Sequence, residues 1–269
     1  MAVTLTFEKK PRFVMNLIDS WVMIKRSSTH ILRNTDQLLG TFFQPIMFLV
    51  LFAAVFGGAI EKALPAGVDY LDYLMAGIIV QTVAFGSTTT AIAVCNDLQK
   101  GIVDRFRSLP MSNLAVLNGH VVSDLLRNTI STVVMLITGL VIGFRSSASF
   151  TDWLLIAGIL MLFTFAFSWL TAIVGLVAKS VEAVQWLSFV IIFPLTFASS
   201  AFVPTDGMPA GLKAFAENQP ITQVINAVRS LILGTPIGNA GWLSVAWSLG
   251  ILVVSMPLAA WLFKRRSIA

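Results

Sequence analysis

The chain has 269 residues, of which 57% are hydrophobic and 12% charged, and its mean hydropathy is +0.85. Soluble domains average about 25% charged residues, so this sequence has too little polar surface to cover a water-soluble globule, and it is too apolar to be disordered. The net charge of +5 does not indicate nucleic-acid binding, because in a membrane protein the side on which basic residues lie matters more than their sum. The one cysteine, Cys95, excludes an intrachain disulfide and a cysteine-built metal site.

Long stretches without charged residues predict six transmembrane helices, because about 20 apolar residues cross a bilayer. We place these helices at residues 42–60, 71–94, 114–144, 153–178, 183–203 and 242–263. The third is too long for one crossing and carries His120, Asp124 and Arg127 in its first half, which we therefore expect to project into the cytosol or the headgroups. Asp124 and Arg127 can pair at i,i+3 spacing, either as a surface pair of little energetic value or as a coupling element.

The segment 204–240 is apolar but is interrupted by four prolines and four glycines. It predicts two short helices, Ala210–Glu217 and Ile221–Leu233, in a re-entrant extracellular hairpin, whose broken backbone needs protein or water around it. The apolar runs lack the alternation of a membrane β-barrel. The predicted fold is therefore a single all-α transmembrane domain, 1–269, with a hairpin before its last span.

The basic residues give the orientation of these spans. If the N-terminus is cytosolic and each span crosses once, most of the 18 lysines and arginines face the cytosol. We expect both termini to be cytoplasmic and the protein to lie in the bacterial plasma membrane. We do not expect a cleaved signal peptide, because the first long apolar run begins only near residue 41.

Two cytosolic segments have amphipathic patterns. Residues 11–37 predict an interfacial helix that includes Trp21, Lys25 and Arg26, because a tryptophan-bearing helix with basic flanks lies naturally at a membrane surface. Residues 98–110 predict a short helix that presents apolar side chains within a charged rim and that Pro110 ends. The residues expected to contact a cytosolic partner are Ile102, Val103, Asp104, Arg105, Phe106, Arg107 and Leu109.

Several chemistries lack their motifs. The sequence has no phosphate-binding G-x-x-x-x-G-K-[ST] loop, no H-E-x-x-H and no G-x-S-x-G, so we expect no ATP binding, no catalysis and no cofactor or metal in this chain. No ionisable residue falls at the midpoint of a predicted span, which disfavours ion-coupled transport. Most polar residues in the spans are expected to join helices. The candidates for a translocation path or a subunit contact are Gln44, Gln81, Gln185, Ser199 and Ser200.

The order of these elements and two motifs resemble the ABC-2 type permease family, most closely its daunorubicin-resistance-type drug exporters. The first motif is Gly101-Ile-Val-Asp-Arg-Phe-Arg-Ser-Leu-Pro-Met-Ser112, which is similar to the coupling segment after the second span. The second comprises Ala201-Phe-Val-Pro-Thr-Asp-Gly-Met-Pro209, Asn218-Gln-Pro-Ile-Thr222 and Ala227-Val-Arg229, similar to the signature after the fifth span. The resemblance covers essentially the whole chain.

This resemblance implies a six-span half-transporter that pairs with an identical or homologous half and with cytosolic ABC ATPase subunits, which carry ATP and magnesium. Residues 98–110 would be the coupling helix and residues 11–37 the connecting helix. The re-entrant hairpin would contain Pro204, Asn218, Pro220 and Arg229. The implied activity is export of an amphiphilic or hydrophobic drug or lipid across the lipid bilayer. The alternatives are a permease for a polysaccharide or lipid-linked glycan, of the O-antigen or teichoic-acid type, and an ion-coupled secondary transporter.

Overall fold

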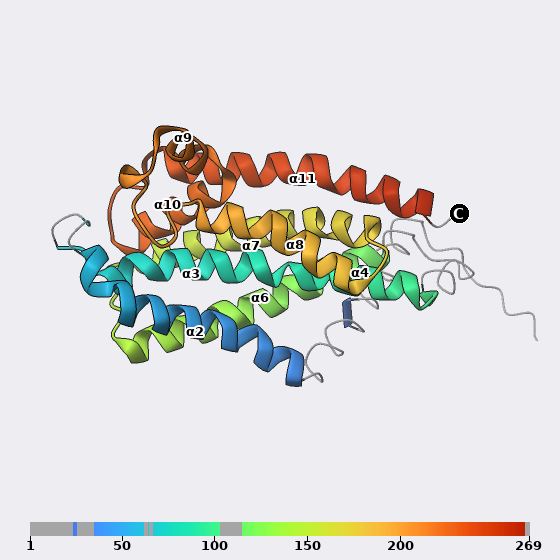
Figure 1. The fold of residues 1–269 in the computed structure, drawn as a ribbon, viewed down its shortest axis with the longest axis horizontal. Helices are drawn as coiled ribbons and strands as arrows, with labels where there is room; N and C mark the ends of the chain where they lie inside the picture. Colours follow the sequence, from blue (N-terminus) through green and yellow to red (C-terminus); the bar gives the residue numbers. More distant parts are fainter. Residues whose placement is uncertain (1–23, 26–34, 62–63, 65–66, 103–114, 267–269) are drawn as a thin grey trace, which may run out of the picture.

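The computed structural model describes residues 24–25, 35–61, 64, 67–102 and 115–266, and all regular secondary structure in these ranges is helical. The all-α fold is therefore confirmed for the described part of the chain. The helices, shown in Figure 1, are α2 (Thr35–Ile60), α3 (Tyr70–Gly86), α4 (Thr88–Gln99), α6 (Ala115–Ile142), α7 (Phe150–Val177), α8 (Val181–Phe197), the 3₁₀ turn η2 (Thr205–Gly207), α9 (Ala210–Asn218), α10 (Pro220–Ile232) and α11 (Gly238–Arg266).

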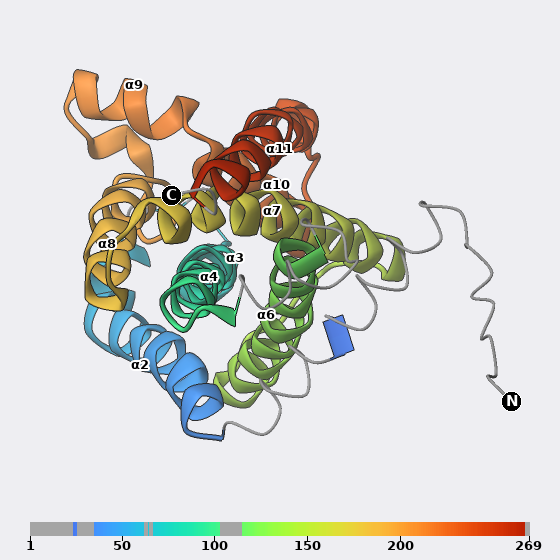
Figure 2. The same cartoon turned by 90° about the vertical axis from the view of Figure 1, so that its right-hand side faces the viewer.

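The long helices form a bundle with two chemically different ends. Seen along its axis, α3 and α4 lie in the middle, surrounded by α2, α6, α7 and α8, while α11 lies on the outer side of α7 (Figure 2). One end, which we call the hairpin end, carries α9 and α10. The other, which we call the basic end, carries Lys100, Lys179 and the last turn of α11 with Lys264–Arg266.

Among the described residues, five helical segments are long and apolar enough to cross a membrane: 43–60, 70–99, 115–142, 150–177 and 238–266. α8 is apolar but has only 17 residues, which at a rise of 1.5 Å per residue spans about 25 Å. Large apolar side chains such as Val141 and Val253 are more than 70% exposed on the outside of the bundle. This exposure is normal where lipid is the solvent, so the protein is a multi-pass membrane protein.

The second predicted span, 71–94, lies within one apolar helical segment, 70–99, which is interrupted at a single residue. α3 ends at Gly86 and α4 begins at Thr88, with Ser87 between them. The Ser87 hydroxyl donates to the Val83 carbonyl at 2.9 Å, and the glycine before it has low helix propensity. We call this site the α3/α4 break.

The predicted fifth span, 183–203, also differs, because α8 ends at Phe197 and a non-helical segment follows. Side chains there bond to nearby backbone: the Ser199 hydroxyl donates to the Thr196 carbonyl at 2.5 Å and accepts from the Ala201 amide at 3.1 Å. Such local bonds compete with the helical ladder and end it. The helices α9 and α10 then lie close to the predicted Ala210–Glu217 and Ile221–Leu233.

Other predicted boundaries shift by several residues. α2 begins at Thr35, inside the predicted connecting segment 11–37, and α11 begins at Gly238, before the predicted 242. α4 continues to Gln99, so it includes the start of the predicted coupling segment 98–110. Within that segment, residues 103–110 lie outside the described residues, as does residue 114 at the start of the predicted third span.

The first half of α6, which we expected to project into the cytosol or the headgroups, packs against neighbouring helices of the bundle. Ala115, Leu117 and Val121 are fully buried in a cluster with α7 and the end of α11. Its polar side chains Ser123, Asp124 and Arg127 are buried as well, and the partly buried His120 faces α4, where its Nε2 lies 2.9 Å from Asp97 Oδ2. The apolar packing of this half-helix therefore holds it in the bundle despite its charged residues.

Candidate functional site

A pocket of about 610 Å³ lies among α2, α3, α4 and α8. The three glutamines that the sequence singled out, Gln44, Gln81 and Gln185, all line it, although they come from three different helices. The remaining lining residues mix aromatic, aliphatic and hydroxyl side chains: Pro45, Phe48, Thr82, Phe85, Gly86, Thr88, Thr89, Ile92, Ser188 and Phe189. None of the described residues that line the pocket carries a charge.

The pocket runs from an exposed rim to a buried floor. At the rim, Gln44 and Gln185 are exposed, while Gln81 on the floor is only 4% exposed. The side-chain nitrogen of Gln81 and the hydroxyl of Ser188 have no hydrogen-bond partner among the described residues. A buried polar group without a partner costs about 1–3 kcal/mol, so the floor favours a molecule that brings polar groups close to these two side chains.

Phenylalanine rings close the pocket toward the hairpin end. Phe48 lines the pocket and its ring centroid lies 6.3 Å from that of Phe197 on α8. Phe197 in turn contacts Phe202 at 4.9 Å, and Phe202 stacks on Phe52 of α2 at 4.3 Å. Aromatic pairs contribute about 0.5–1.5 kcal/mol each beyond their buried area, so this cluster forms an apolar barrier between the pocket and the hairpin.

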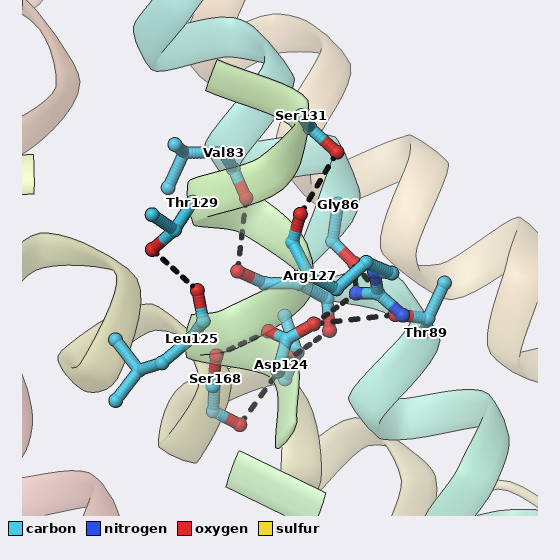
Figure 3. A network of polar contacts seen from close by, with 11 residues as sticks. Val83, Gly86, Thr89, Asp124, Leu125, Arg127, Thr129, Ser131 and Ser168 are labelled. Carbon is cyan, nitrogen blue, oxygen red and sulfur yellow. Dashed lines mark hydrogen bonds and ion pairs between the residues drawn. The ribbon is translucent and has the colours of Figure 1, made fainter. Parts of the chain in front are cut away.

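Behind the pocket, α6 and α7 place polar side chains around the α3/α4 break (Figure 3). Arg127 Nη2 donates to the Gly86 carbonyl at 2.5 Å, and the guanidinium pairs with Asp124 one turn away. Asp124 also accepts from the Ser168 hydroxyl at 2.5 Å. From α7, the Thr171 hydroxyl donates to the Ser87 carbonyl at 2.8 Å. These bonds give side-chain donors to the two backbone carbonyls at the break, those of Gly86 and Ser87.

The sequence left two alternatives for Asp124 and Arg127, and the structure excludes the surface pair. Their side chains are 2% and 3% exposed and lie near the middle of α6. The pair is buried because α6 packs against both the α3/α4 break and α7, which covers the face that carries these residues. An isolated charge there would cost several kcal/mol, so each residue depends on the other.

A second buried cluster surrounds Arg229 on α10. Its guanidinium donates to the Tyr73 carbonyl at 3.2 Å and to the carbonyl and hydroxyl of Ser200 at 2.6 and 3.2 Å. It also donates to Asn226 Oδ1 at 3.2 Å and lies 3.5 Å from the centroid of the Tyr73 ring. The Tyr73 hydroxyl donates to the same Ser200 carbonyl at 3.0 Å. Arg229 therefore joins the hairpin to α3 and to the end of α8.

The other predicted hairpin residues shape its backbone. Pro204 precedes η2, and Pro220 is the first residue of α10, where its missing amide hydrogen costs nothing. Asn218 Nδ2 donates to the Ala214 carbonyl at 2.8 Å within α9. Lys213 forms a 2.7 Å hydrogen bond with Asp206, which raises the pKa of the lysine. These residues order the hairpin but do not line the pocket.

The remaining predicted site residues lie elsewhere. Ser199 and Ser200 are buried beside Arg229 rather than in the pocket. Lys25 and Ile102 are described, and the Ile24 carbonyl accepts from the Ser123 hydroxyl of α6 at 3.3 Å. The other predicted coupling and connecting residues, namely Val103, Asp104, Arg105, Phe106, Arg107, Leu109, Trp21 and Arg26, lie outside the described residues.

Sequence reasoning missed the α3/α4 break and the residues that support it. A signal existed, because Gly86 and the hydroxyl residues Ser87–Thr90 form a polar run inside an apolar span. Such residues weaken a helix and bond to its backbone. The partners Ser168 and Thr171 had no comparable signal, since isolated hydroxyls are common in membrane helices.

Comparisons with known proteins agree with this architecture. Residues 19–233 match the family model described as ABC-2 type transporter. The chain is 32% identical to the daunorubicin resistance ABC transporter permease protein DrrB1 of Streptomyces coeruleorubidus over 86% of this chain and 81% of the relative. It is 27% identical to the probable doxorubicin resistance ABC transporter permease protein DrrC of Mycobacterium tuberculosis (84% and 82%), and 26% identical to the putative transport permease ycf38 of Cyanophora paradoxa (91% and 87%). The chain thus belongs to the ABC-2 type transporter family, as a permease related to those of drug-resistance exporters.

Proposed function

We propose that this chain is the membrane subunit of an ABC exporter that moves an uncharged or weakly charged aromatic amphiphile out of a bacterial cell. The observation that carries the proposal is the pocket, which combines phenylalanine rings with glutamine and hydroxyl groups and whose described lining carries no charge. Apolar walls with a few polar groups are typical of sites for small amphiphilic ligands. Drug-resistance relatives at 27–32% identity support a drug as the cargo.

The proposed topology has six spans, with the basic end in the cytosol. Lys100, Lys179 and the last turn of α11 lie together at that end, and basic residues are enriched in cytosolic segments. α8, extended by the segment up to residue 203, would complete the sixth crossing. The helices α9 and α10 would then form a re-entrant hairpin on the outside, anchored by Arg229, and both termini would be cytoplasmic.

We infer that energy enters at the basic end from separate ATPase subunits that bind ATP and magnesium. α4 ends at Gln99, directly before the segment with Asp104–Arg107, which we propose as the ATPase contact. The connecting segment with Trp21, Lys25 and Arg26 would lie beside it, which fits the contact between Ile24 and α6. The chain itself is proposed to hold no nucleotide.

A second permease half, of identical or homologous sequence, would complete the transporter. Apolar side chains on α2 and α8 point outward around the pocket rim; Phe43 is 70% exposed and Trp186 69%. We propose that part of this surface meets the second half and that the rest contacts lipid. The pocket would then open toward the contact between halves.

Transport by purified components tests the proposal. The chain is reconstituted in liposomes with an ABC ATPase that co-purifies with it, and uptake of daunorubicin into liposomes whose ATPase side faces outward is followed by its fluorescence. We expect uptake that requires ATP and falls about tenfold in Gln81→Leu, because the floor then loses its polar contacts while the apolar walls remain. Gln223→Leu, on α10 away from the pocket, should transport normally.

Three results would count against the proposal. Uptake by the chain alone, driven by a proton or sodium gradient, would indicate a secondary transporter. ATP-dependent transport of a lipid-linked glycan with no effect of Gln81→Leu would indicate the glycan-exporting class and a different path. Loss of uptake in Gln223→Leu to the same degree would show that the effect of Gln81→Leu is not specific to the pocket.

A further inference from the structure

The pocket shares two residues with the α3/α4 break. Gly86 and Thr89 line the pocket, and they also contact the buried pair behind it. The Thr89 hydroxyl lies 2.8 Å from the Gly86 carbonyl and 3.3 Å from Asp124 Oδ1, while Arg127 donates to the same Gly86 carbonyl. The Thr89 hydroxyl has one hydrogen for two acceptors, so a molecule in the pocket that bonds to Thr89 changes which acceptor it uses.

The two helices that meet at the break are held by different partners. On the hairpin side, Gly77 of α3 lies so close to the backbone of Ala201 that a β-carbon there would overlap it. On the basic side, Gly175 of α7 lies equally close to the backbone of Ala91 on α4. Gln99 Nε2 also donates to the Lys179 carbonyl at 2.9 Å. A change of direction at the break therefore moves α4 together with the helix α7 that holds it, while α3 keeps its contact with the segment after α8.

The polar groups at the break are not fully satisfied. Three side-chain atoms there have no hydrogen-bond partner among the described residues: the amide oxygen and nitrogen of Asn128 and the Nε of Arg127. Both residues are at least 97% buried. The Asn128 amide lies directly against Gly86. Buried groups without partners are expected where a second arrangement of the same side chains exists, because that arrangement can supply the missing bonds.

We propose that Asp124 and Arg127 are positioning residues that link occupancy of the pocket to the direction of α4. In the arrangement seen here, Arg127 holds the Gly86 carbonyl and Asp124 holds Arg127, Thr89 and Ser168. A ligand at Thr89 weakens one of these bonds and releases α4, whose end at Gln99 leads into the proposed ATPase contact. The pair thereby sets how strongly substrate stimulates the ATPase. This inference rests on the proposed function.

The choice of variants follows from the burial of the pair. Replacing one partner alone leaves an unpaired buried charge, so single variants are expected to fold poorly. The double variant Asp124→Asn/Arg127→Gln removes both charges and keeps polar side chains of similar size. Thr89→Val removes the hydroxyl that joins the pocket to Asp124 and leaves the pair intact. The matched control is Thr129→Val on α6, the helix that carries the pair. The Thr129 hydroxyl donates to the Leu125 carbonyl and points away from the break in Figure 3.

The first measurement needs no ligand. Amide hydrogen exchange of the purified permease–ATPase complex is compared at residues 84–92. We expect exchange about tenfold faster in the double variant, because the Gly86 carbonyl loses the guanidinium that holds it, and no change in Thr129→Val. Unchanged exchange in a folded double variant would overturn the proposal, since the pair then does not hold the break.

The second measurement is ATP hydrolysis by the reconstituted complex with and without daunorubicin. In the double variant, whose changed residues do not line the pocket, we expect basal hydrolysis and daunorubicin binding within about twofold of the wild-type values and a stimulation reduced at least about fivefold. In Thr89→Val, which removes a polar group of the pocket, we expect a similar loss of stimulation at daunorubicin concentrations that saturate binding. Full stimulation in both variants would overturn the proposal. A wild-type complex that neither binds daunorubicin nor responds to it would instead count against the proposed function, and the exchange measurement would still decide the role of the pair.

Discussion

The guanidinium of Arg229 on α10 lies 3.5 Å from the centroid of the Tyr73 ring on α3 and donates to the Tyr73 carbonyl at 3.2 Å. This one side chain of the hairpin thus makes a cation–π contact with an aromatic ring and donates hydrogen bonds to nearby backbone carbonyls. Among the described residues, carbonyl and hydroxyl oxygens, rather than a carboxylate, surround this cation. The arrangement fixes the hairpin to α3 and to the segment that follows α8.

Replacing Arg229 is expected to loosen the hairpin. Arg229→Ala leaves the Ser200 and Tyr73 carbonyls short of a donor and removes the cation over the ring, a loss of about 2–4 kcal/mol. We expect a lower melting temperature in detergent and reduced export, while the ATPase stays bound. Arg145→Ala, which removes an exposed arginine at the same end, should have little effect on either. Equal melting temperatures for the two variants would contradict this role of Arg229.

The contact between α4 and α7 depends on the absence of a side chain at Gly175. In Gly175→Ala the new β-carbon meets the Ala91 backbone, which cannot rotate away, so we expect destabilisation of about 1–3 kcal/mol. Gly158 is a matched control because it lies on the same helix and has open space around its α-carbon. Gly158→Ala should be neutral or slightly stabilising, by up to about 1 kcal/mol. The stabilities of Gly175→Ala and Gly158→Ala are compared by heating each variant and measuring by size-exclusion chromatography the fraction that remains folded.

The size of residue 86 is limited by Asn128. The new β-carbon in Gly86→Ala would overlap the amide oxygen of Asn128. Because this atom belongs to a side chain, a smaller residue at position 128 would remove the overlap. We expect Gly86→Ala to lower stability by about 1–3 kcal/mol and the double variant Gly86→Ala/Asn128→Ala to recover most of that loss. A double-mutant cycle on melting temperatures checks this, and strictly additive losses would show that the two residues do not meet.

The segment after α4 is predicted to bind the ATPase. Phe106→Asp places a charge on the proposed apolar contact, and Arg105→Glu reverses a charge on its rim. We expect normal membrane insertion of both variants, with ATPase co-purification lost in the first and reduced about tenfold in the second. Lys213→Glu, which changes a charge on α9 at the hairpin end, is the control. Full retention of the ATPase by Phe106→Asp would contradict the coupling assignment.

Composition and charge alone determined the class of this protein. The lack of polar surface makes lipid the only solvent that suits the chain, and the gaps between charged residues locate its long helices, although several of their ends differ in the structure. The motifs at Gly101–Ser112 and Asn218–Thr222 indicated the family, which the comparisons confirm. These properties are local in the sequence, so no tertiary information is needed to find them.

Only the tertiary structure decided which polar residues act together. Gln44, Gln81 and Gln185 were chosen as costly to bury, but their meeting at one pocket depends on how α2, α3 and α8 pack. In the sequence, Asp124 and Arg127 could equally form a surface pair or a coupling element. The structure buries them because α6 turns this face toward the α3/α4 break. Helical periodicity tells which residues share a face of one helix. It cannot tell which neighbour covers that face, since apolar faces pack equally well against lipid and against several other helices.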